Sequence, residues 1–274
     1  MGVKFAICNE MFENWDLRKV MALAARLGYS AVEIAPFTLA DDVRKLGKKA
    51  RKKIVEDSES LGVEIAGTHW LLVKPEGLHI THPDQSIRGK TVEYLKALAE
   101  FTADIGGRVM VFGSPKQRNV LPGVDPSKAW AWAVEAFKKA SRYCGDLGVT
   151  LCIEPLSRDQ TNFINTCRDA LKLIEDVAEP SFKLILDVRS MADEGRPIHE
   201  IVADGREHLT HFHANDTNGL GPGFGKADYH KIARTLLEIG FSGYASVEIF
   251  DFTLGSKYIA TRSIENLKTY FGVI

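Results

Sequence analysis

Short apolar runs alternate with helical patterns along the whole chain. Between the runs, apolar residues recur at the i, i+3, i+4 and i+7 spacing of an amphipathic helix, as at Leu17, Val20, Met21 and Ala24. Strict strand–helix alternation favours a parallel sheet, and eight units favour closure into a barrel over an open, doubly wound sheet. The runs that predict strands are Lys4–Cys8, Ala31–Ala35, Glu64–Thr68, Val109–Phe112, Val149–Ile153, Lys183–Leu186, Leu209–Phe212 and Tyr244–Val247. We therefore expect a single α/β domain over residues 1–274, built as one (β/α)₈ TIM barrel.

Glycine closes several of the predicted helices. Gly28, Gly62, Gly106, Gly148 and Gly240 each follow an apolar residue at the end of a helical pattern. Glycine is favoured at this place because it takes the left-handed C-cap conformation without strain. The recurrence is a structural repeat of the strand–helix unit, with no sequence repeat behind it.

The length and composition agree with a single TIM barrel and indicate which classes of partner to expect. The 274 residues are close to the roughly 250 of a TIM barrel, and the 45% hydrophobic and 26% charged fractions are typical of a globular protein. A net charge of −1 gives no field that would attract nucleic acid or an anionic membrane. The first residues of the sequence lack the apolar region of a signal peptide, and no apolar stretch approaches the roughly 18 residues of a membrane helix. We expect neither a membrane nor a nucleic-acid partner.

The cysteines indicate a reducing compartment. Cys8, Cys144, Cys152 and Cys167 have no CxxC spacing, so they suggest neither a zinc ribbon nor a disulfide framework. We expect a cytoplasmic protein with reduced thiols. The sequence leaves open whether the chain assembles into a homo-oligomer.

Four residues of metal-ligand type close the last four predicted strands. Glu154, Asp187, His213 and Glu248 are separated by 33, 26 and 35 residues, close to the roughly 30 residues of one βαβ unit. The carboxyl ends of parallel barrel strands converge on one point, where such barrels carry out their chemistry. A lone carboxylate at a strand end is more often a helix cap or a surface ion pair, but four such residues in equivalent positions predict one divalent metal site. Three carboxylates and one imidazole favour Mn²⁺, although Mg²⁺, Co²⁺ and Zn²⁺ also fit.

The same pattern indicates a reaction. Glu154 and Glu248 lie on different strands and would approach a bound hydroxy-ketone from different sides. The metal would polarise the carbonyl and stabilise an enediolate, while the two glutamates act as general base and general acid. Returning the proton to the opposite face is epimerisation, whereas returning it to the neighbouring carbon is isomerisation. We therefore predict a metal-dependent isomerase or epimerase that acts on a small carbohydrate or a sugar-derived keto compound.

Six segments share one resemblance: Ile153–Arg158, Phe163–Thr166, Leu186–Asp187, His211–Asp216, Gly221–Gly225 and Val247–Glu248. They resemble the D-tagatose/D-psicose 3-epimerase family, which belongs to the xylose-isomerase-like barrel superfamily together with sugar-phosphate isomerase/epimerase-like proteins. The resemblance spans most of the chain and is densest from residue 149 onward. It implies that Glu154, Asp187, His213 and Glu248 hold the metal and that the two glutamates also act as acid and base.

The chain departs from this family in the residues that bind the substrate. The resemblance implies a histidine three residues after the aspartate ligand and an arginine six residues after the histidine ligand, but the chain has Ser190 and Gly219 there. Gln160 stands where the family has a glutamate six residues after the first glutamate ligand. The resemblance therefore implies a similar metal centre with a different substrate.

Other polar residues are candidates for substrate binding. Lys116 and Arg118, in the loop after the fourth strand, would clamp a carboxylate or phosphate at the barrel mouth, or they form a solvated basic loop. His69 and Trp70 end the third strand and would hydrogen-bond and stack on a sugar, unless the histidine is structural. The remaining candidates are Gln160, Arg189 and His211, and His211 is also a spare metal ligand.

Residues outside this set have simpler interpretations. Glu33, in the second strand, is expected only to pair with a neighbouring strand. His79 and His82 are expected to lie in a solvated loop, which could also act as a lid. Phe12 and Trp15, near the first strand, either wall the pocket or pack in the core.

Three other functions stay open at this point. A lyase of the inosose-dehydratase type would use the same enolate to eliminate water, and a sugar-binding barrel would not turn its ligand over. A metal-dependent endonuclease fits worst, because Phe112 and Ser190 stand where its zinc cluster would need histidines. The basic run 44–53 is expected to be a solvated helix face.

Overall fold

The apolar runs form parallel strands that pair in chain order, and the last strand pairs with the first. The structure is a computed structural model that describes residues 2–273. Within these residues the strands are β1 (Lys4–Cys8), β2 (Ala31–Ile34), β3 (Glu64–Thr68), β4 (Val109–Phe112), β5 (Thr150–Ile153), β6 (Phe182–Asp187), β7 (Leu209–Ala214) and β8 (Tyr244–Val247). The predicted (β/α)₈ TIM barrel is confirmed.

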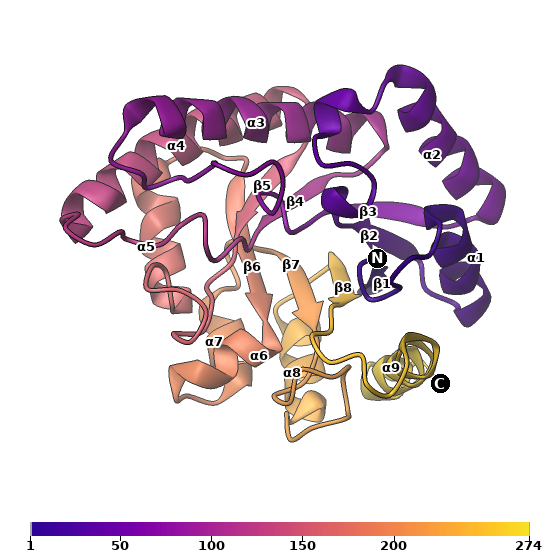
Figure 1. The fold of residues 1–274 in the computed structure, drawn as a ribbon. Helices are drawn as coiled ribbons and strands as arrows, with labels where there is room; N and C mark the ends of the chain where they lie inside the picture. The colour runs from indigo at the N-terminus through magenta and orange to yellow at the C-terminus, as the bar shows by residue number, and fades with distance from the viewer. Residues whose placement is uncertain (1, 274) are drawn as a thin grey trace.

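Helices surround the strands on the outside of the barrel (Figure 1). They are α1 (Leu17–Leu27), α2 (Lys48–Leu61), α3 (Gln85–Asp104), α4 (Pro126–Asp146), α5 (Cys167–Val177), α6 (Val188–Met191), α7 (Ile198–Asp204), α8 (Tyr229–Glu238) and α9 (Ser256–Tyr270). The last helix, α9, contacts the first, α1, so the helical layer closes as the sheet does. Gly28 and Gly62 cap α1 and α2 at φ angles of 87° and 64°, as the glycine pattern predicts.

Two predicted strands are longer in the structure, and the extra residues belong to the predicted metal site. Asp187 is the last residue of β6, and His213 lies inside β7, which continues to Ala214. Asp187 pairs in register with His213 across the β6–β7 ladder. The backbones of these two ligands are therefore held by the sheet itself.

Small side chains fill part of the barrel interior. Ala6, Ala31 and Ala66 form one buried cluster inside it, while the large hydrophobic core lies between the strands and the helices. Polar side chains replace them towards the carboxyl ends of the strands, where His211 and His213 are fully buried. Buried ionisable side chains therefore gather towards the carboxyl ends of the strands.

The basic run 44–53 is mostly exposed and pairs with nearby acids, as expected of a solvated face. Arg51 bonds Asp104 at 2.8 Å, and Lys53 contacts Asp57 at 2.6 Å. No helix between residues 2 and 273 is long and apolar enough to cross a membrane.

His79 differs from its predicted place in a solvated loop. It lies in the segment between β3 and α3 with only 9% of its surface exposed, and its Nδ1 lies 3.4 Å from the hydroxyl of Thr81. Burial, together with the nearby His82, lowers the pKa of His79 to about 4. The expectation of a solvated histidine is wrong here, because this part of the segment folds inward against α3, where Thr91 accepts the His79 backbone N–H at 2.8 Å.

The buried imidazole predicts a pH-dependent contribution to stability. The pKa of His79 is about 4 in the folded state and about 6.5 in the unfolded chain, so only the unfolded chain takes up a proton between these values. The free energy of unfolding should fall by on the order of 1–2 kcal/mol as the pH drops through this window. In His79→Gln this contribution is absent, and the curve of unfolding free energy against pH should be flatter.

Urea unfolding followed by circular dichroism at pH 7.0, 5.5 and 4.5 measures the difference. His230→Gln, which changes an exposed histidine, is the matched control and should keep the wild-type slope. Parallel curves for wild type and His79→Gln would contradict the prediction.

Candidate active site

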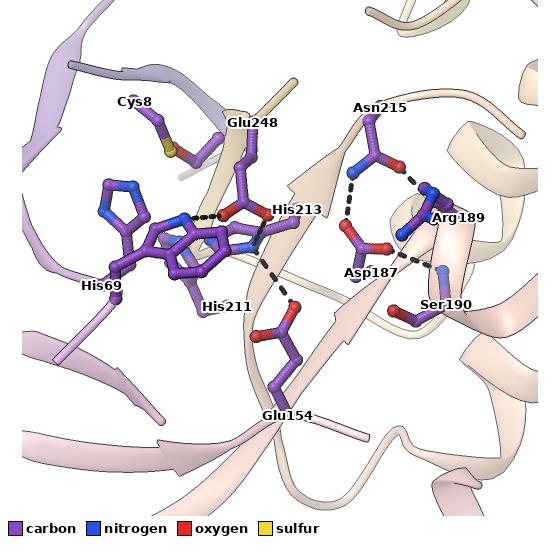
Figure 2. A network of polar contacts seen from close by, with 12 residues as sticks. Cys8, His69, Glu154, Asp187, Arg189, Ser190, His211, His213, Asn215 and Glu248 are labelled. Atoms are coloured by element: carbon purple, nitrogen blue, oxygen red, sulfur yellow. Dashed lines mark hydrogen bonds and ion pairs between the residues drawn. The ribbon is translucent and has the colours of Figure 1, made fainter. Parts of the chain in front are cut away.

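The four predicted metal ligands converge at the carboxyl ends of β5 to β8. Glu154 follows β5 directly and Glu248 follows β8, while Asp187 and His213 lie within β6 and β7. One donor atom from each of the four side chains lies within 4.8 Å of the others, and all four residues are buried. Figure 2 shows Glu154 and Glu248 facing His213 from two sides, with Asp187 beyond them.

The cluster places one imidazole among three carboxylates. His213 Nδ1 lies 3.0 Å from Glu248 Oε2 and 3.6 Å from Glu154 Oε1. Burial alone would lower the pKa of His213, but Glu248 and Glu33 raise it well above its usual value. Burial, followed by the charges of Glu154 and Glu248, raises the pKa of Asp187 to about 7. The site therefore carries more negative charge than His213 neutralises, and it favours a cation.

These donors fit a divalent ion. Oxygen donors with a single imidazole nitrogen are the ligand set of Mn²⁺ and similar ions. The Nδ1 atom of His213 is buried and faces Glu154 and Glu248, and it finds no hydrogen-bond partner of good geometry among residues 2–273. Glu154, Asp187, His213 and Glu248 are the residues that could hold such an ion.

The Asp187 carboxylate is oriented by backbone and side-chain donors. Its Oδ1 accepts the backbone N–H of Ser190 at 2.7 Å, and its Oδ2 accepts the amide of Asn215. The Asn215 Oδ1 in turn accepts the N–H of Arg189 at 2.9 Å, as Figure 2 shows. Asn215 lies within the motif His211–Asp216, and no local pattern in the sequence indicates that its side chain contacts the end of the neighbouring strand.

Glu33 lies behind the imidazole and is fully buried in the barrel interior. It accepts hydrogen bonds from the Nε2 atoms of His211 at 2.7 Å and His213 at 3.2 Å. Burial would raise the pKa of Glu33, but the two histidines lower it well below its usual value. Glu33 Oε1 also lies 3.6 Å from His69 Nδ1 at the end of the neighbouring strand β3. The expectation that Glu33 only pairs with a neighbouring strand is wrong, because its side chain also reaches across the barrel from β2 to β7. A carboxylate inside an apolar strand was the signal that could have identified it.

His211 lies below the site and not at its mouth. Its side chain is fully buried, and its Nε2 is engaged by Glu33. The prediction that His211 contacts the substrate does not fit this position, because His213, two residues further along the same face of β7, stands between it and the mouth.

His69 and Trp70, which follow β3, lie at the site as the sequence suggested. His69 Nε2 contacts Glu10 Oε2 at 2.7 Å; burial lowers the pKa of His69, but Glu10 raises it to about 9. Trp70 Nε1 donates to Glu248 Oε1 at 2.9 Å. Both residues line a small pocket together with Gln160, Phe250 and the glutamates Glu154 and Glu248.

The side chain of Arg118 does not lie at the barrel mouth, where the predicted cationic clamp would need it. Only 1% of its surface is exposed, and its guanidinium donates to the backbone carbonyls of Glu154 and Phe112, both at 2.6 Å. The expectation of a cation at the mouth is wrong for Arg118, because its charge is used to fasten the ends of β4 and β5. A Cβ on Gly113 would lie 1.9 Å from Glu154 Oε2, so this strand end also needs a residue without a side chain.

Two other predicted substrate-binding cations lie nearer to solvent. Lys116 is exposed in the loop after β4. Arg189 is half-buried, lies 5.1 Å from the centre of the Phe250 ring and contacts Asp159 at 3.3 Å. Their roles toward a substrate stay predictions.

Comparison with known proteins identifies related sequences and folds. Residues 21–270 match the family model described as "Xylose isomerase-like TIM barrel". A D-psicose 3-epimerase of Ruminiclostridium cellulolyticum is 24% identical over 274 residues, covering 97% of this chain and 89% of that protein. A D-psicose 3-epimerase of Agrobacterium fabrum is 30% identical over a shorter stretch of 133 residues, covering 48% of this chain and 46% of that protein.

A solved structure supports the same fold. The crystal structure of a D-psicose 3-epimerase in the presence of D-fructose superposes with a TM-score of 0.87, covering 98% of this chain and all of that one. The sequence identity of this pair is 19%, so the similarity concerns the fold.

The position of Glu33 predicts its effect on metal affinity. Since it holds the Nε2 side of His213, it fixes the orientation of the ring and increases its basicity. Glu33→Gln should weaken Mn²⁺ binding by roughly 10- to 100-fold. Isothermal titration calorimetry with Mn²⁺ measures the affinity independently of turnover.

Glu64→Gln is the matched control, since Glu64 begins β3 at the opposite end of the barrel and pairs with Lys4. It should bind Mn²⁺ as the wild type does. An unchanged affinity in a folded Glu33→Gln protein would show that Glu33 does not act on the metal site.

Proposed function

Since this chain belongs to the xylose isomerase-like TIM barrel family, we propose that it is a metal-dependent sugar epimerase. One observation carries the proposal: Glu154 and Glu248 approach the same imidazole from different strands, with a carboxylate oxygen of each within 4.8 Å of the other ligands. The curated relatives that match it include 3-epimerases from several bacteria. The substrate class that we infer is a hydroxy-ketone sugar.

The two glutamates would move the proton. One carboxylate takes the proton from the carbon next to the substrate carbonyl, and the other returns a proton to the opposite face of that carbon. A divalent ion, when bound by the four ligands, would polarise the carbonyl and stabilise the negative charge that develops. The position of Glu248 is fixed by the Trp70 indole, whose N–H donates to Oε1 and leaves Oε2 directed at His213.

The relatives of the chain favour epimerisation over water elimination. Inversion needs a carboxyl group on each side of the reacting carbon, and β5 and β8 supply these two groups. Elimination needs one base and one group that protonates the leaving hydroxyl, so the same two glutamates would serve that reaction as well. The matching relatives are named as 3-epimerases, and this supports inversion.

The proposal also covers the identity of the metal ion and the cellular compartment of the protein. We infer Mn²⁺ because three carboxylates and one imidazole form the ligand set. A cytoplasmic location is supported by the four cysteines, which are all free and buried. The assembly of several copies stays a prediction.

Solvent deuterium exchange tests the reaction. With Mn²⁺, NMR should show deuterium uptake next to the carbonyl of a hydroxy-ketone sugar, and a chelator should abolish it. Glu248→Gln and Glu154→Gln should each slow the exchange by at least roughly 10²-fold, because each removes one acid–base group. Glu238→Gln, at the end of α8, should exchange at the wild-type rate.

The reaction products distinguish an epimerase from a lyase. An inverted stereocentre supports epimerisation, whereas loss of water would identify a lyase and overturn the proposal. A wild-type exchange rate in Glu248→Gln would also overturn it, because the mechanism would then lack one of its two proton carriers.

A further inference from the structure

A second group of metal-ligand side chains lies at the carboxyl ends of β1 and β3. Cys8 is the last residue of β1, Glu10 lies two residues after it, and His69 directly follows β3. One donor atom from each of these three side chains lies within 4.8 Å of the others. In Figure 2, Cys8 and His69 lie to the left of His213, whereas Asp187 lies to its right. The group therefore occupies the part of the barrel mouth that the four ligands on β5 to β8 leave free.

Two polar atoms of this group are buried without a hydrogen-bond partner. His69, with 1% of its surface exposed, contacts Glu10 Oε2 through its Nε2 at 2.7 Å. The other ring nitrogen, Nδ1, and the other carboxylate oxygen, Oε1, find no hydrogen-bond partner among residues 2–273. The contact of Nδ1 with Glu33 Oε1, at 3.6 Å, is too long for a hydrogen bond. Unpartnered buried polar atoms are rare in folded proteins, and an ion is one of the ways in which they are satisfied.

The three donors are chemically different from the four ligands described above. Cys8 adds sulfur to one imidazole nitrogen and one carboxylate oxygen. A sulfur ligand favours Zn²⁺ and similar thiophilic ions, whereas an oxygen-rich set favours Mn²⁺. The two groups of ligands should therefore prefer different cations.

The spacing of the donors is close to that of a zinc site. Zn²⁺ lies about 2.3 Å from a cysteine sulfur and about 2.0–2.2 Å from nitrogen or oxygen ligands, so tetrahedral donors lie roughly 3.3–3.8 Å apart. Donors within 4.8 Å of one another reach this spacing through side-chain shifts of about 1 Å. Cys8 is fully buried, and its Sγ lies 3.4 Å from the hydroxyl of Ser246, which supports the position of the sulfur.

We propose that Cys8, Glu10 and His69 form a second cation site, which binds Zn²⁺ in preference to Mn²⁺. Three protein ligands leave the fourth tetrahedral position to water. The ion replaces the protons on the Cys8 thiol and on the His69 ring nitrogen that it binds, and these protons leave to solvent. The inference goes beyond the proposed function and does not depend on it.

The second site adjoins the first without sharing a ligand. The ring centres of His69 and His213 lie 6.0 Å apart. Trp70, which follows His69, donates its indole N–H to Glu248 Oε1 at 2.9 Å. A cation bound by His69 would therefore lie one residue from the group that positions Glu248.

A cobalt titration tests the second site. Co²⁺ bound to a thiolate absorbs strongly in the near ultraviolet through charge transfer from sulfur, whereas Co²⁺ held by oxygen and nitrogen ligands lacks this band. Co²⁺ added to the Mn²⁺-loaded protein, with its thiols kept reduced, should produce the band. Zn²⁺ should then remove the band by displacing Co²⁺, and Mg²⁺ should leave it, because Mg²⁺ binds poorly to sulfur.

Variants assign the band to these residues. Cys8→Ser should abolish it, because the sulfur is removed, whereas Cys144→Ser, which changes a buried cysteine of α4, should keep it. Glu10→Gln retains every thiol and should weaken the binding of Co²⁺ at least about tenfold. Glu13→Gln, which changes an exposed glutamate of the same loop, should leave the affinity unchanged.

Circular dichroism establishes that each variant is folded. A folded wild-type protein without the charge-transfer band would overturn the second site. A band that survives in Cys8→Ser, or an unchanged affinity for Co²⁺ in Glu10→Gln, would overturn it as well. The band is read without any substrate, so its outcome is independent of whether the protein exchanges deuterium into a sugar.

Discussion

Three carboxylates meet one imidazole in the buried end of the barrel, and a fourth carboxylate, that of Glu33, lies behind the ring. Burying charges of one sign is costly unless they are paired. His213 offsets part of this cost by facing carboxylates with both ring nitrogens. Burial, followed by the remaining repulsion from Glu154 and Glu248, raises the pKa of Asp187. This excess negative charge is what makes the end of the barrel a site for a cation.

The surrounding structure holds these charges where the strands end. The sheet ladder positions the backbones of Asp187 and His213, and Arg118 donates a hydrogen bond to the backbone carbonyl of Glu154. Asn215 orients the Asp187 carboxylate. Each of these supports acts on a ligand without occupying the space in front of it. The ligands are therefore largely preorganised, which reduces the ordering that binding would otherwise require.

Two kinds of surface adjoin each other at the mouth of the barrel. On one side are the ionisable groups, which favour a metal and a polar, reacting part of a substrate. On the other side is a wider cavity lined by aromatic rings and by polar residues that include Asn9, Glu10 and Asn14. Trp70 belongs to both, since its ring lines the cavity and its N–H holds Glu248.

The sequence by itself determined the barrel and the convergence of Glu154, Asp187, His213 and Glu248. Strand periodicity and the position of a residue at a strand end are local properties, and parallel closure brings equivalent strand ends to one place. The tertiary structure alone decided the partners of Glu33, Arg118 and His79. Glu33 bonds to histidines about 180 residues away across the barrel interior, and Arg118 folds back under the strand ends instead of facing solvent. Such contacts depend on which side chains meet through space once the barrel has closed, and no spacing along the chain encodes them.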